Sequence, residues 1–497
     1  MKNKLPDSFY NLISMAGAVI AAITFSLIII LAIVTTILDR GNAYFGLIIY
    51  MILPGVMIFG LILIPIGMYF EKKKSEENKG KLPIINLNTP QHRNATAIFL
   101  FGTAILLFAS AIGGYEAFHF SESDQFCGEI CHEVMKPEYT AYQTSAHARV
   151  GCAECHVGSG ADWFVKAKIT GLYQVYAVMA NTYERPIPTP IKNLRPARET
   201  CEQCHWPEKF YSSTMRKEIH YLSDEKNTRW DINLTVKVGA ESSAKSLSEG
   251  SHWHISPNTK VEYISTDEKR QEIPWVRYTN LETGEITVYD GDDSIDPDSL
   301  GNYEIRTMDC MDCHNRPSHN YRPPAVFINE ALARGDVSPE LPEIKSLTME
   351  LLGEEYPTTD SAMAAIRNGI LEFYSEDYED IFEEQKELIE KSIVGVQNAF
   401  NQNIFPEMKV RWDYYPNNIG HFEFDGCFRC HDSYHESEEG KVISNDCNQC
   451  HVINAQGPAD SLQVAKFGEP LEFRHPVDID EMWKESLCTD CHTGLNP

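Results

Sequence analysis

The cysteines constrain this chain more than any other feature. All 14 of them lie after residue 126, and they occur as pairs in which a histidine directly follows the second cysteine. Six pairs have the spacing C-x-x-C-H, and a seventh has one extra residue between its thiols. The motifs are Cys127/Cys131/His132, Cys152/Cys155/His156, Cys201/Cys204/His205, Cys310/Cys313/His314, Cys427/Cys430/His431, Cys447/Cys450/His451 and Cys488/Cys491/His492. No cysteine is left over.

This spacing is typical of covalent haem attachment, because two thiols add to the haem vinyl groups and the adjoining histidine becomes an axial ligand of the iron. Chance placement would give roughly 0.01 such motifs in a chain of this composition. Zinc sites and disulfide frameworks also use cysteines, but neither needs a histidine after every second cysteine. The sequence therefore predicts seven covalently bound haem c groups. Because few residues serve each haem, the haems themselves should form much of the interior.

Three stretches without charge precede the cysteines. We expect transmembrane helices at about 12–38, 43–70 and 94–115, within a membrane domain of residues 1–115, because each stretch is long enough to cross a bilayer. The first exceeds the apolar core of a signal peptide, so it should remain as an anchor. The connection between the second and third helices contains Lys72, Lys73, Lys74, Lys79, Lys81 and Arg93.

Positive residues mark the cytoplasmic side of a membrane protein. By this rule the N-terminus and the 71–93 connection are cytoplasmic, and the haem region is periplasmic, in the inner (cytoplasmic) membrane. Covalent haem attachment of this kind also takes place outside the cytoplasm. We therefore expect a membrane-anchored multihaem cytochrome c whose periplasmic region is mostly α-helical or irregular.

The periplasmic region divides by cysteine density and by local patterning. Alternating segments at Leu234 to Val238, Val261 to Ser265 and Glu285 to Tyr289 predict a strand-rich insertion, whereas Met363, Ile366, Ile370 and Phe373 recur at helical spacing. The expected parts are a haem domain with haems 1–3 at 116–205, the insertion at 206–309, the haem 4 motif at 310–324, a helical region at 325–420 and a trihaem cluster at 421–497.

The chain is strongly acidic. It has 43 Lys and Arg against 71 Asp and Glu, which gives a formal net charge of −28. Nucleic-acid binding is therefore disfavoured. A soluble, basic periplasmic cytochrome c is the kind of partner that this charge should attract.

A low-spin haem needs a second axial ligand, so the histidines outside the motifs are candidates, except His92, which falls on the cytoplasmic side. Five of them lie beside haem motifs: His147, His319, His421, His435 and His475. His252 and His254 lie in the predicted insertion, where we expect one of them to reach a haem and the other to structure the loop.

Residues 94–205 and 310–319 resemble the NapC/NirT/NrfH family of membrane-anchored multihaem quinol dehydrogenases. The resemblance rests on a membrane helix that leads into Phe126-Cys127…Cys131-His132…Met135, then Ser145-Ala146-His147, Gly151 to Val157, and Lys166-Ala167-Lys168. Seven haems in a chain of this length look like the larger heptahaem inner-membrane cytochromes of metal-reducing bacteria, the ImcH-like group.

The resemblance implies that the first haem lies at the membrane surface with Met135 as an axial ligand. It also implies that His147 serves the third haem and His319 the second. The family's quinol pocket points to Lys166 and Lys168, but the acidic residue that the family places after the lysine is missing here. Proton acceptance then falls to Glu129, Glu133 or water.

The function expected from these features is menaquinol oxidation at the membrane, with electrons passed through seven haems to periplasmic acceptors during respiration on extracellular or metal acceptors. One alternative is a terminal reductase of a small oxyanion such as nitrite, although the chain has no C-x-x-C-K motif. Another is the membrane anchor subunit of a larger reductase complex. The first two membrane helices serve as an anchor, or contribute to quinone binding or to a homo-oligomer.

Overall fold

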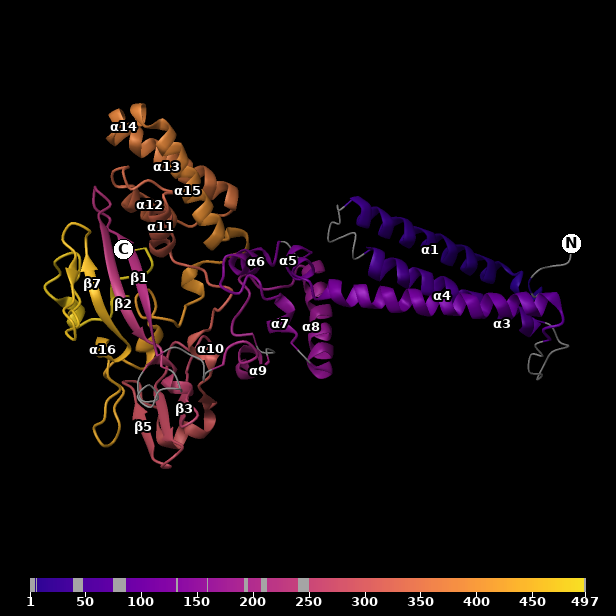
Figure 1. Cartoon of the computed structure of the whole chain (residues 1–497), viewed down its shortest axis with the longest axis horizontal. Coiled ribbons are helices and arrows are strands. Elements are labelled where there is room, and N and C mark those ends of the chain that lie inside the picture. The colour runs from indigo at the N-terminus through magenta and orange to yellow at the C-terminus, as the bar shows by residue number, and fades with distance from the viewer. Residues whose placement is uncertain are drawn as a thin grey trace. The chain divides into compact units, whose positions relative to one another are not determined.

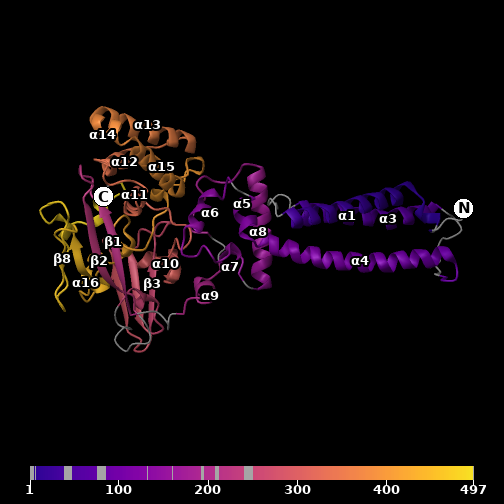
Figure 2. The same cartoon turned by 45° about the horizontal axis from the view of Figure 1, so that its top comes forward.

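The computed structural model describes residues 5, 7–38, 48–74, 86–130, 133–158, 160–191, 195–206, 212–239 and 250–495. The chain forms two compact units. The first is Met1–Met135 with Gly151–Ala153, and the second is Lys136–Val150 with Glu154–Pro497. Figures 1 and 2 show the helices and strands of each unit.

The first unit contains three helices that are long and apolar enough to cross a membrane. They are α1 (Leu12–Leu38), α3 (Leu53–Lys74) and α4 (Pro90–Ser121), followed by the short helix α5 (Asp124–Glu129). A five-residue π-helix, η2 (Ile48–Ile52), precedes α3, and η1 (Asp7–Phe9) precedes α1. The three helices expected from the uncharged stretches are confirmed; the start of the second expected helix, residues 43–47, lies outside the described residues.

Helices α1 and α3 pack closely through glycines, and both views show them side by side (Figures 1 and 2). A Cβ added to Gly17 would lie 2.5 Å from the carbonyl oxygen of Gly60, so no larger residue fits there. The Ser14 hydroxyl donates a hydrogen bond to the carbonyl of Ile64 at 2.8 Å. Small residues and interhelical hydrogen bonds are the usual means of helix association in lipid. Helix α4, in contrast, has no buried residue.

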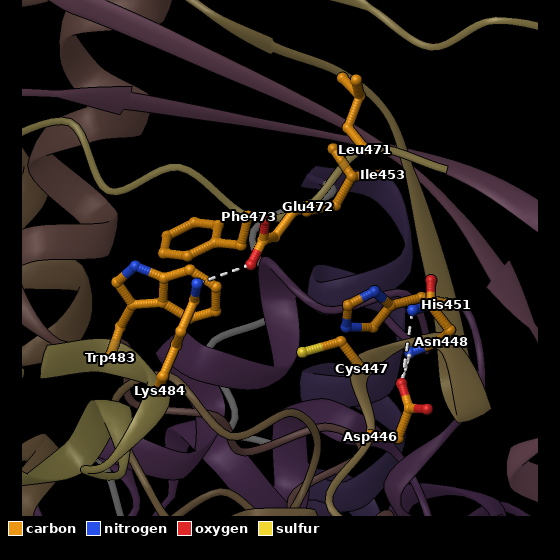
Figure 3. Close-up of a pocket in the computed structure, with 10 residues that line it drawn as sticks. All are labelled: Asp446, Cys447, Asn448, His451, Ile453, Leu471, Glu472, Phe473, Trp483 and Lys484. Carbon is orange, nitrogen blue, oxygen red and sulfur yellow. Dashed lines mark hydrogen bonds and ion pairs between the residues drawn. The ribbon is translucent and has the colours of Figure 1, made fainter. Parts of the chain in front are cut away.

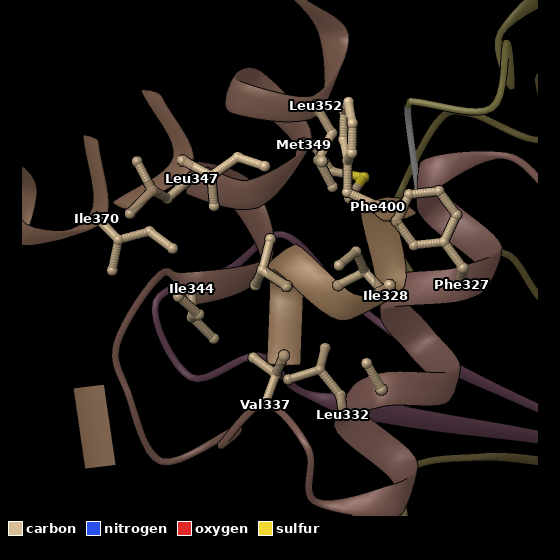
Figure 4. Packing of buried hydrophobic residues seen from close by; sticks show 14 of the residues in the cluster. Phe327, Ile328, Leu332, Val337, Ile344, Leu347, Met349, Leu352, Ile370 and Phe400 are labelled. Atoms are coloured by element: carbon tan, nitrogen blue, oxygen red, sulfur yellow. The ribbon is translucent and has the colours of Figure 1, made fainter. Parts of the chain in front are cut away.

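The second unit contains a helical layer without a haem motif. Its helices are α11 (Pro324–Arg334), α12 (Ile344–Gly353), α13 (Thr359–Asp377), α14 (Glu379–Glu384) and α15 (Lys386–Asn403). They enclose a core in which Phe327, Ile328, Ile370 and Phe400 are almost fully buried (Figure 4). The stripe at helical spacing faces this core, because Ile366 is buried and its neighbours in the stripe pack against the same cluster.

The unit also contains two antiparallel sheets. One has the order β1-β2-β7-β8, and the other has the order β5-β4-β3-β6. The strands of the first sheet are β1 (Ser213–Tyr221), β2 (Arg229–Lys237), β7 (His451–Gly457) and β8 (Gln463–Val464). Those of the second are β3 (Thr259–Ile264), β4 (Trp275–Asn280), β5 (Ile286–Asp290) and β6 (Arg306–Thr307).

The strands expected at 206–309 are present, but they do not form one self-contained sheet. Strand β2 pairs on its second edge with β7, which comes from the C-terminal cysteine-rich region, and Leu234 lies opposite Ile453. Alternation in a sequence indicates a strand but not its partner. The pairing brings the end of β2 next to His451, the first residue of β7, which is also the histidine of the sixth motif.

The remaining helices are short, apart from α8. They are α6 (Lys136–Gln143), α7 (Cys152–His156), α8 (Ala161–Met179), α9 (Ala197–Cys201), η6 (Ser251–Ile255), η7 (Pro297–Asn302), α10 (Cys310–Cys313), η8 (Pro406–Met408), η9 (Trp412–Tyr414), η10 (Gly426–Arg429), α16 (Cys447–Cys450), η11 (Met482–Lys484) and η12 (Cys488–Asp490). Most of these short helices either contain a haem motif or present a histidine to one.

Candidate haem-binding sites

Six motifs share one local structure, a single helical turn at the cysteines. In the third, fourth, fifth and seventh motifs the backbone N–H of the histidine donates a hydrogen bond to the carbonyl of the first cysteine. These bonds join His205 to Cys201 at 2.8 Å, His314 to Cys310 at 2.8 Å, His431 to Cys427 at 3.0 Å and His492 to Cys488 at 2.9 Å. The same bond caps the sixth motif, from His451 to Cys447. The short spacing thus gives all of these motifs the same compact turn.

Five motif cysteines lie at the surface of the polypeptide: Cys155, Cys204, Cys427, Cys447 and Cys491. Haem attachment at Cys491 and at the other four stays a prediction, and it requires a thiol that the vinyl group can reach.

Each histidine of these six motifs faces a second histidine from elsewhere in the chain. The distances between ring centres are 6.1 Å for His156 and His319, 6.0 Å for His205 and His147, 6.3 Å for His314 and His252, 5.8 Å for His431 and His254, 6.1 Å for His451 and His421, and 6.1 Å for His492 and His475. An iron bonded to two imidazoles needs roughly 6 Å between the ring centres, since each bond is about 2 Å and each ring centre lies about 1 Å beyond its nitrogen. All six pairs therefore fit bis-histidine haem iron.

The hydrogen bonds of the rings fix which nitrogen would bind iron. In four of these histidines the Nδ1 atom lies within hydrogen-bond distance of a backbone carbonyl: His147 with Pro317 at 3.2 Å, His319 with Glu138 at 3.0 Å, His254 with Ser251 at 2.9 Å and His431 with Ser444 at 2.9 Å. A carbonyl can only accept, so Nδ1 carries the proton and Nε2 keeps its lone pair. Metal-binding histidines commonly have such a partner for the other ring nitrogen.

The surroundings of the rings favour neutral imidazole, which is the form that binds iron. Burial lowers the pKa of His254 and of His319 to about 4. Burial is also the first cause of a lowered pKa at His156, His252, His314, His421 and His451.

Helix η6 presents both of its histidines to haem motifs. We expected only one of His252 and His254 to reach a motif, but the structure places them opposite the histidines of the fourth and fifth motifs. Gly250 begins this turn with a φ of +104°, and a Cβ there would lie 2.7 Å from the backbone nitrogen of Gly239. The close approach of the turn to the end of β2 is what brings both rings within reach.

His435 is not brought to a haem motif, contrary to the expectation for a histidine that flanks the fifth motif. Its Nδ1 lies 2.9 Å from an Asp432 carboxylate oxygen, and its Nε2 lies 2.7 Å from the carbonyl of Ile273. Burial opposes a charge on this ring, but these hydrogen bonds outweigh burial and raise the pKa of His435. With both nitrogens engaged, neither is available to iron. His421, the other flanking residue, faces the sixth motif instead of the fifth.

The first motif is only partly described. Cys127 lies in α5, whereas Cys131 and His132 lie outside the described residues. Met135 is half-buried, and Glu129 and Glu133 are exposed.

Thiols of successive motifs lie close enough to shift one another's pKa before haem attachment. Hydrogen bonds to Cys127 and Cys310 are the first causes of the raised pKa of Cys152 and Cys201, respectively. At four further cysteines burial is the largest cause of a raised pKa. The charge of a cysteine from a neighbouring motif raises the pKa further. The four pairs are Cys155 with Cys204, Cys313 with Cys427, Cys450 with Cys427, and Cys488 with Cys447. The motifs are therefore adjacent in space in the order of the sequence, from the first to the seventh.

A cavity of about 210 Å³ adjoins the sixth motif. Figure 3 shows Cys447 and His451 on one side of it and the aromatic rings of Phe473 and Trp483 on the other. Lys484 closes this wall through an ion pair with Glu472 at 2.9 Å. A thiol, an imidazole and aromatic walls in one hollow are what a flat, apolar ring with a central iron requires.

The described side chains do not favour the zinc alternative. Among these residues, no three of the types His, Cys, Asp and Glu converge into a site for a bare metal ion. The thirteen described cysteines also form no disulfide.

The two lysines of the expected quinol pocket lie on α8. Lys166 Nζ is 4.9 Å from the centre of the Trp163 ring, and Lys168 Nζ is 5.1 Å from the Phe164 ring. The same helix exposes an apolar face at helical spacing, formed by Val165, Ile169, Leu172, Tyr173, Tyr176 and Met179. This face was not predicted from the sequence. Its residues recur every three or four positions, which is the signal that would have revealed it.

A membrane anchor of three helices, followed by a region built around C-x-x-C-H turns and facing imidazoles, defines a membrane-anchored multihaem cytochrome c. Comparison with known proteins agrees. Residues 89–187 match the N-terminal region of the NapC/NirT cytochrome c family. The chain is 40% identical to cytochrome c-type protein ImcH of Geobacter sulfurreducens over 493 residues, which cover 98% of this chain and 96% of that protein.

A second relative is cytochrome c-type protein NrfH of Wolinella succinogenes, which is 27% identical over 154 residues, or 29% of this chain and 85% of that protein. No solved structure matches the chain. The chain belongs to the NapC/NirT cytochrome c family, in its larger, ImcH-like group. It is therefore a membrane protein of electron transfer with covalently bound haem c.

Proposed function

We propose that this protein oxidises menaquinol at the cytoplasmic membrane and passes the electrons through seven haems to periplasmic acceptors. The observation that carries the proposal is the set of six histidine pairs at iron-binding distance, on motifs that follow one another in space. Haem c, when bound, supplies a one-electron Fe(III)/Fe(II) couple at each of these sites. The task of the chain is to hold the pairs, exclude water and keep the sites adjacent.

The paired histidines argue against the terminal reductase alternative. Reduction of a small oxyanion requires a haem iron with an open position. At six motifs a second imidazole faces the motif histidine, so with haem bound it would take the position that a substrate needs. Saturated irons of this kind transfer electrons and do not bind substrates.

Helix α8 supports electron entry from a lipid-soluble donor. An exposed apolar face with tyrosines and nearby lysines is typical of a helix that lies at a membrane interface, where menaquinol is available. We propose that Lys166 and Lys168 hydrogen-bond the quinol oxygens. We also propose that Glu129, Glu133 or water accepts the protons. Oxidation releases two electrons and two protons. The entry site therefore needs a proton acceptor as well as the lysines that bind the quinol.

Replacement of Lys166 or Lys168 by glutamine should slow menaquinol oxidation by about tenfold, because each lysine would lose a charge-assisted hydrogen bond worth about 1.5 kcal/mol. The assay follows haem reduction by a menaquinol analogue in proteoliposomes. Lys391→Gln, on the exposed surface of α15, is the matched control. Equal rates in all of these variants would exclude the two lysines from the entry site.

We propose that the N-terminus is cytoplasmic and that the haem region is periplasmic, as the distribution of lysines and arginines indicates. Electrons would then leave from the C-terminal trihaem cluster to a soluble, basic cytochrome c. The net charge of −28, together with two propionates on each haem, provides the attraction.

This attraction predicts a salt dependence. The rate constant for reduction of a basic cytochrome c should fall at least tenfold between about 0.01 and 0.15 M ionic strength, because screening shortens the Debye length from about 30 to 8 Å. Stopped-flow mixing of the prereduced protein with the oxidised partner measures it, and an acidic cytochrome c serves as the control. A rate that does not change with salt would rule out electrostatic steering.

A further inference from the structure

Within the described part of the chain, two arginines near the second haem site have enclosed donors without hydrogen-bond partners. In Arg316, the Nε and Nη2 atoms are shielded from solvent and have no hydrogen-bond partner. In Arg195, the same is true of Nε and Nη1. A guanidinium remains charged in proteins, and a buried charge without a hydrogen-bonded counterpart is costly. Among the residues that the structure describes, the enclosed donors of these two arginines therefore have no anionic partner.

Arg316 lies in the loop that supplies ligands to several haem sites. Its guanidinium carbon is 4.3 Å from the centre of the Tyr415 ring and 5.0 Å from that of Tyr321. Three residues further on is His319, the histidine that faces the second motif. The neighbouring carbonyl of Pro317 accepts from His147, which faces the third motif. The two aromatic rings fix the position of the guanidinium. Its Nε and Nη2 atoms can still donate hydrogen bonds.

Arg195 packs against Gly158, just after the motif histidine of the same ligand pair. Its side chain is only 8% exposed, and its Nη2 reaches Glu199 at 3.3 Å. Gly158, two residues after His156, has a φ of +66°, and a Cβ there would lie 2.3 Å from Arg195 Nη1. Glycine at this position thus makes room for the guanidinium beside the proximal histidine.

We propose that Arg316 and Arg195 bind the two propionate carboxylates of the haem held between His156 and His319. This inference rests on the proposed function, because it requires haem at the second motif. A guanidinium matches a carboxylate in shape and charge, and the two form the strongest common hydrogen-bonded ion pair. The two cations would also stabilise the reduced iron, so the second haem would accept electrons more readily.

The test is a redox titration of purified Arg316→Gln and Arg195→Gln, followed by visible and electron paramagnetic resonance spectra. We expect the reduction equilibrium of one low-spin haem to shift at least tenfold toward the oxidised form in each variant, which corresponds to 59 mV for a one-electron couple. Arg316→Lys keeps the charge and should shift this equilibrium less than Arg316→Gln. Arg334→Gln, on the exposed surface of α11, is the matched control and should not shift it.

Unchanged potentials in both glutamine variants, or equal shifts in Arg316→Gln and Arg316→Lys, would overturn the proposal. Glu138 is the anion that competes with a propionate for Arg316. Its carboxylate lies near enough to raise the pKa of Arg316, and among the described residues its Oε2 is also enclosed without a partner. If Glu138 is the counterion, Glu138→Gln should restore the potential of Arg316→Gln, and this result would also overturn it. The pyridine haemochrome assay counts the haems in each protein and so separates failure of this proposal from failure of the proposed function. A protein without haem at this motif would contradict both the proposal and the proposed function.

Discussion

Replacement of His254 by alanine is expected to convert one low-spin haem into a high-spin haem, while replacement of His435 by alanine changes the spin state of none. The ring of His254 lies 5.8 Å from that of His431, the distance that an iron between them requires, whereas both nitrogens of His435 are bonded to the protein. Low-temperature electron paramagnetic resonance of the oxidised proteins measures the change. One high-spin signal should appear in the first variant only.

A third variant tests whether this effect comes from ligation. His254→Met supplies a thioether in place of the imidazole, which should keep the iron low-spin and raise its midpoint potential. A high-spin signal in His435→Ala, or its absence in His254→Ala, would contradict the assignment of the pair. Electron transfer through the protein should also slow in His254→Ala, because the fifth site lies between the fourth and sixth in the order of adjacent thiols.

The two histidines show what the sequence can and cannot predict about such a site. The C-x-x-C-H turns are local, since five consecutive residues form each of them, so their spacing alone predicts their structure. The second histidine comes from a distant part of the chain, and its identity depends on how sheets and loops pack. His435 lies four residues after a motif and turns away from it, whereas His254 lies 177 residues before His431, the motif histidine that it faces.

The same limit applies to the fold. The three membrane helices and the helices of the 325–402 region follow from hydrophobic runs and helical spacing, which are properties of short segments. The pairing of β2 with β7 joins residues more than 200 positions apart, and nothing in the alternation of either strand indicates its partner. This long-range pairing places His451 at the start of β7, beside the end of β2, and so helps to build the sixth site.

The helical layer has no haem motif, so its stability must come from its own side chains, and Lys345 is an unusual part of that core. The side chain is fully buried in the cluster, and its Nζ donates to the carbonyl of Ala325 at 2.9 Å. Burial lowers the pKa of Lys345 to about 7. In the unfolded chain the group keeps its ordinary pKa near 10.4. Between pH 7 and 10 the unfolded state therefore binds more protons, so the stability of the layer should rise with pH.

Lys345→Met should remove this pH dependence and raise the free energy of unfolding of the layer at pH 7 by about 3 to 5 kcal/mol. The upper end is the free energy that corresponds to a shift of roughly three to four pKa units. Hydrogen–deuterium exchange of peptides from α11 and α12, corrected for intrinsic rates at pH 7 and pH 9, measures the local free energy of unfolding. Lys391→Met, on the exposed surface of α15, is the control and should keep the wild-type pH dependence. If protection in the wild-type protein does not increase between the two pH values, the buried ammonium is compensated by another group, and the lowered pKa of Lys345 is wrong.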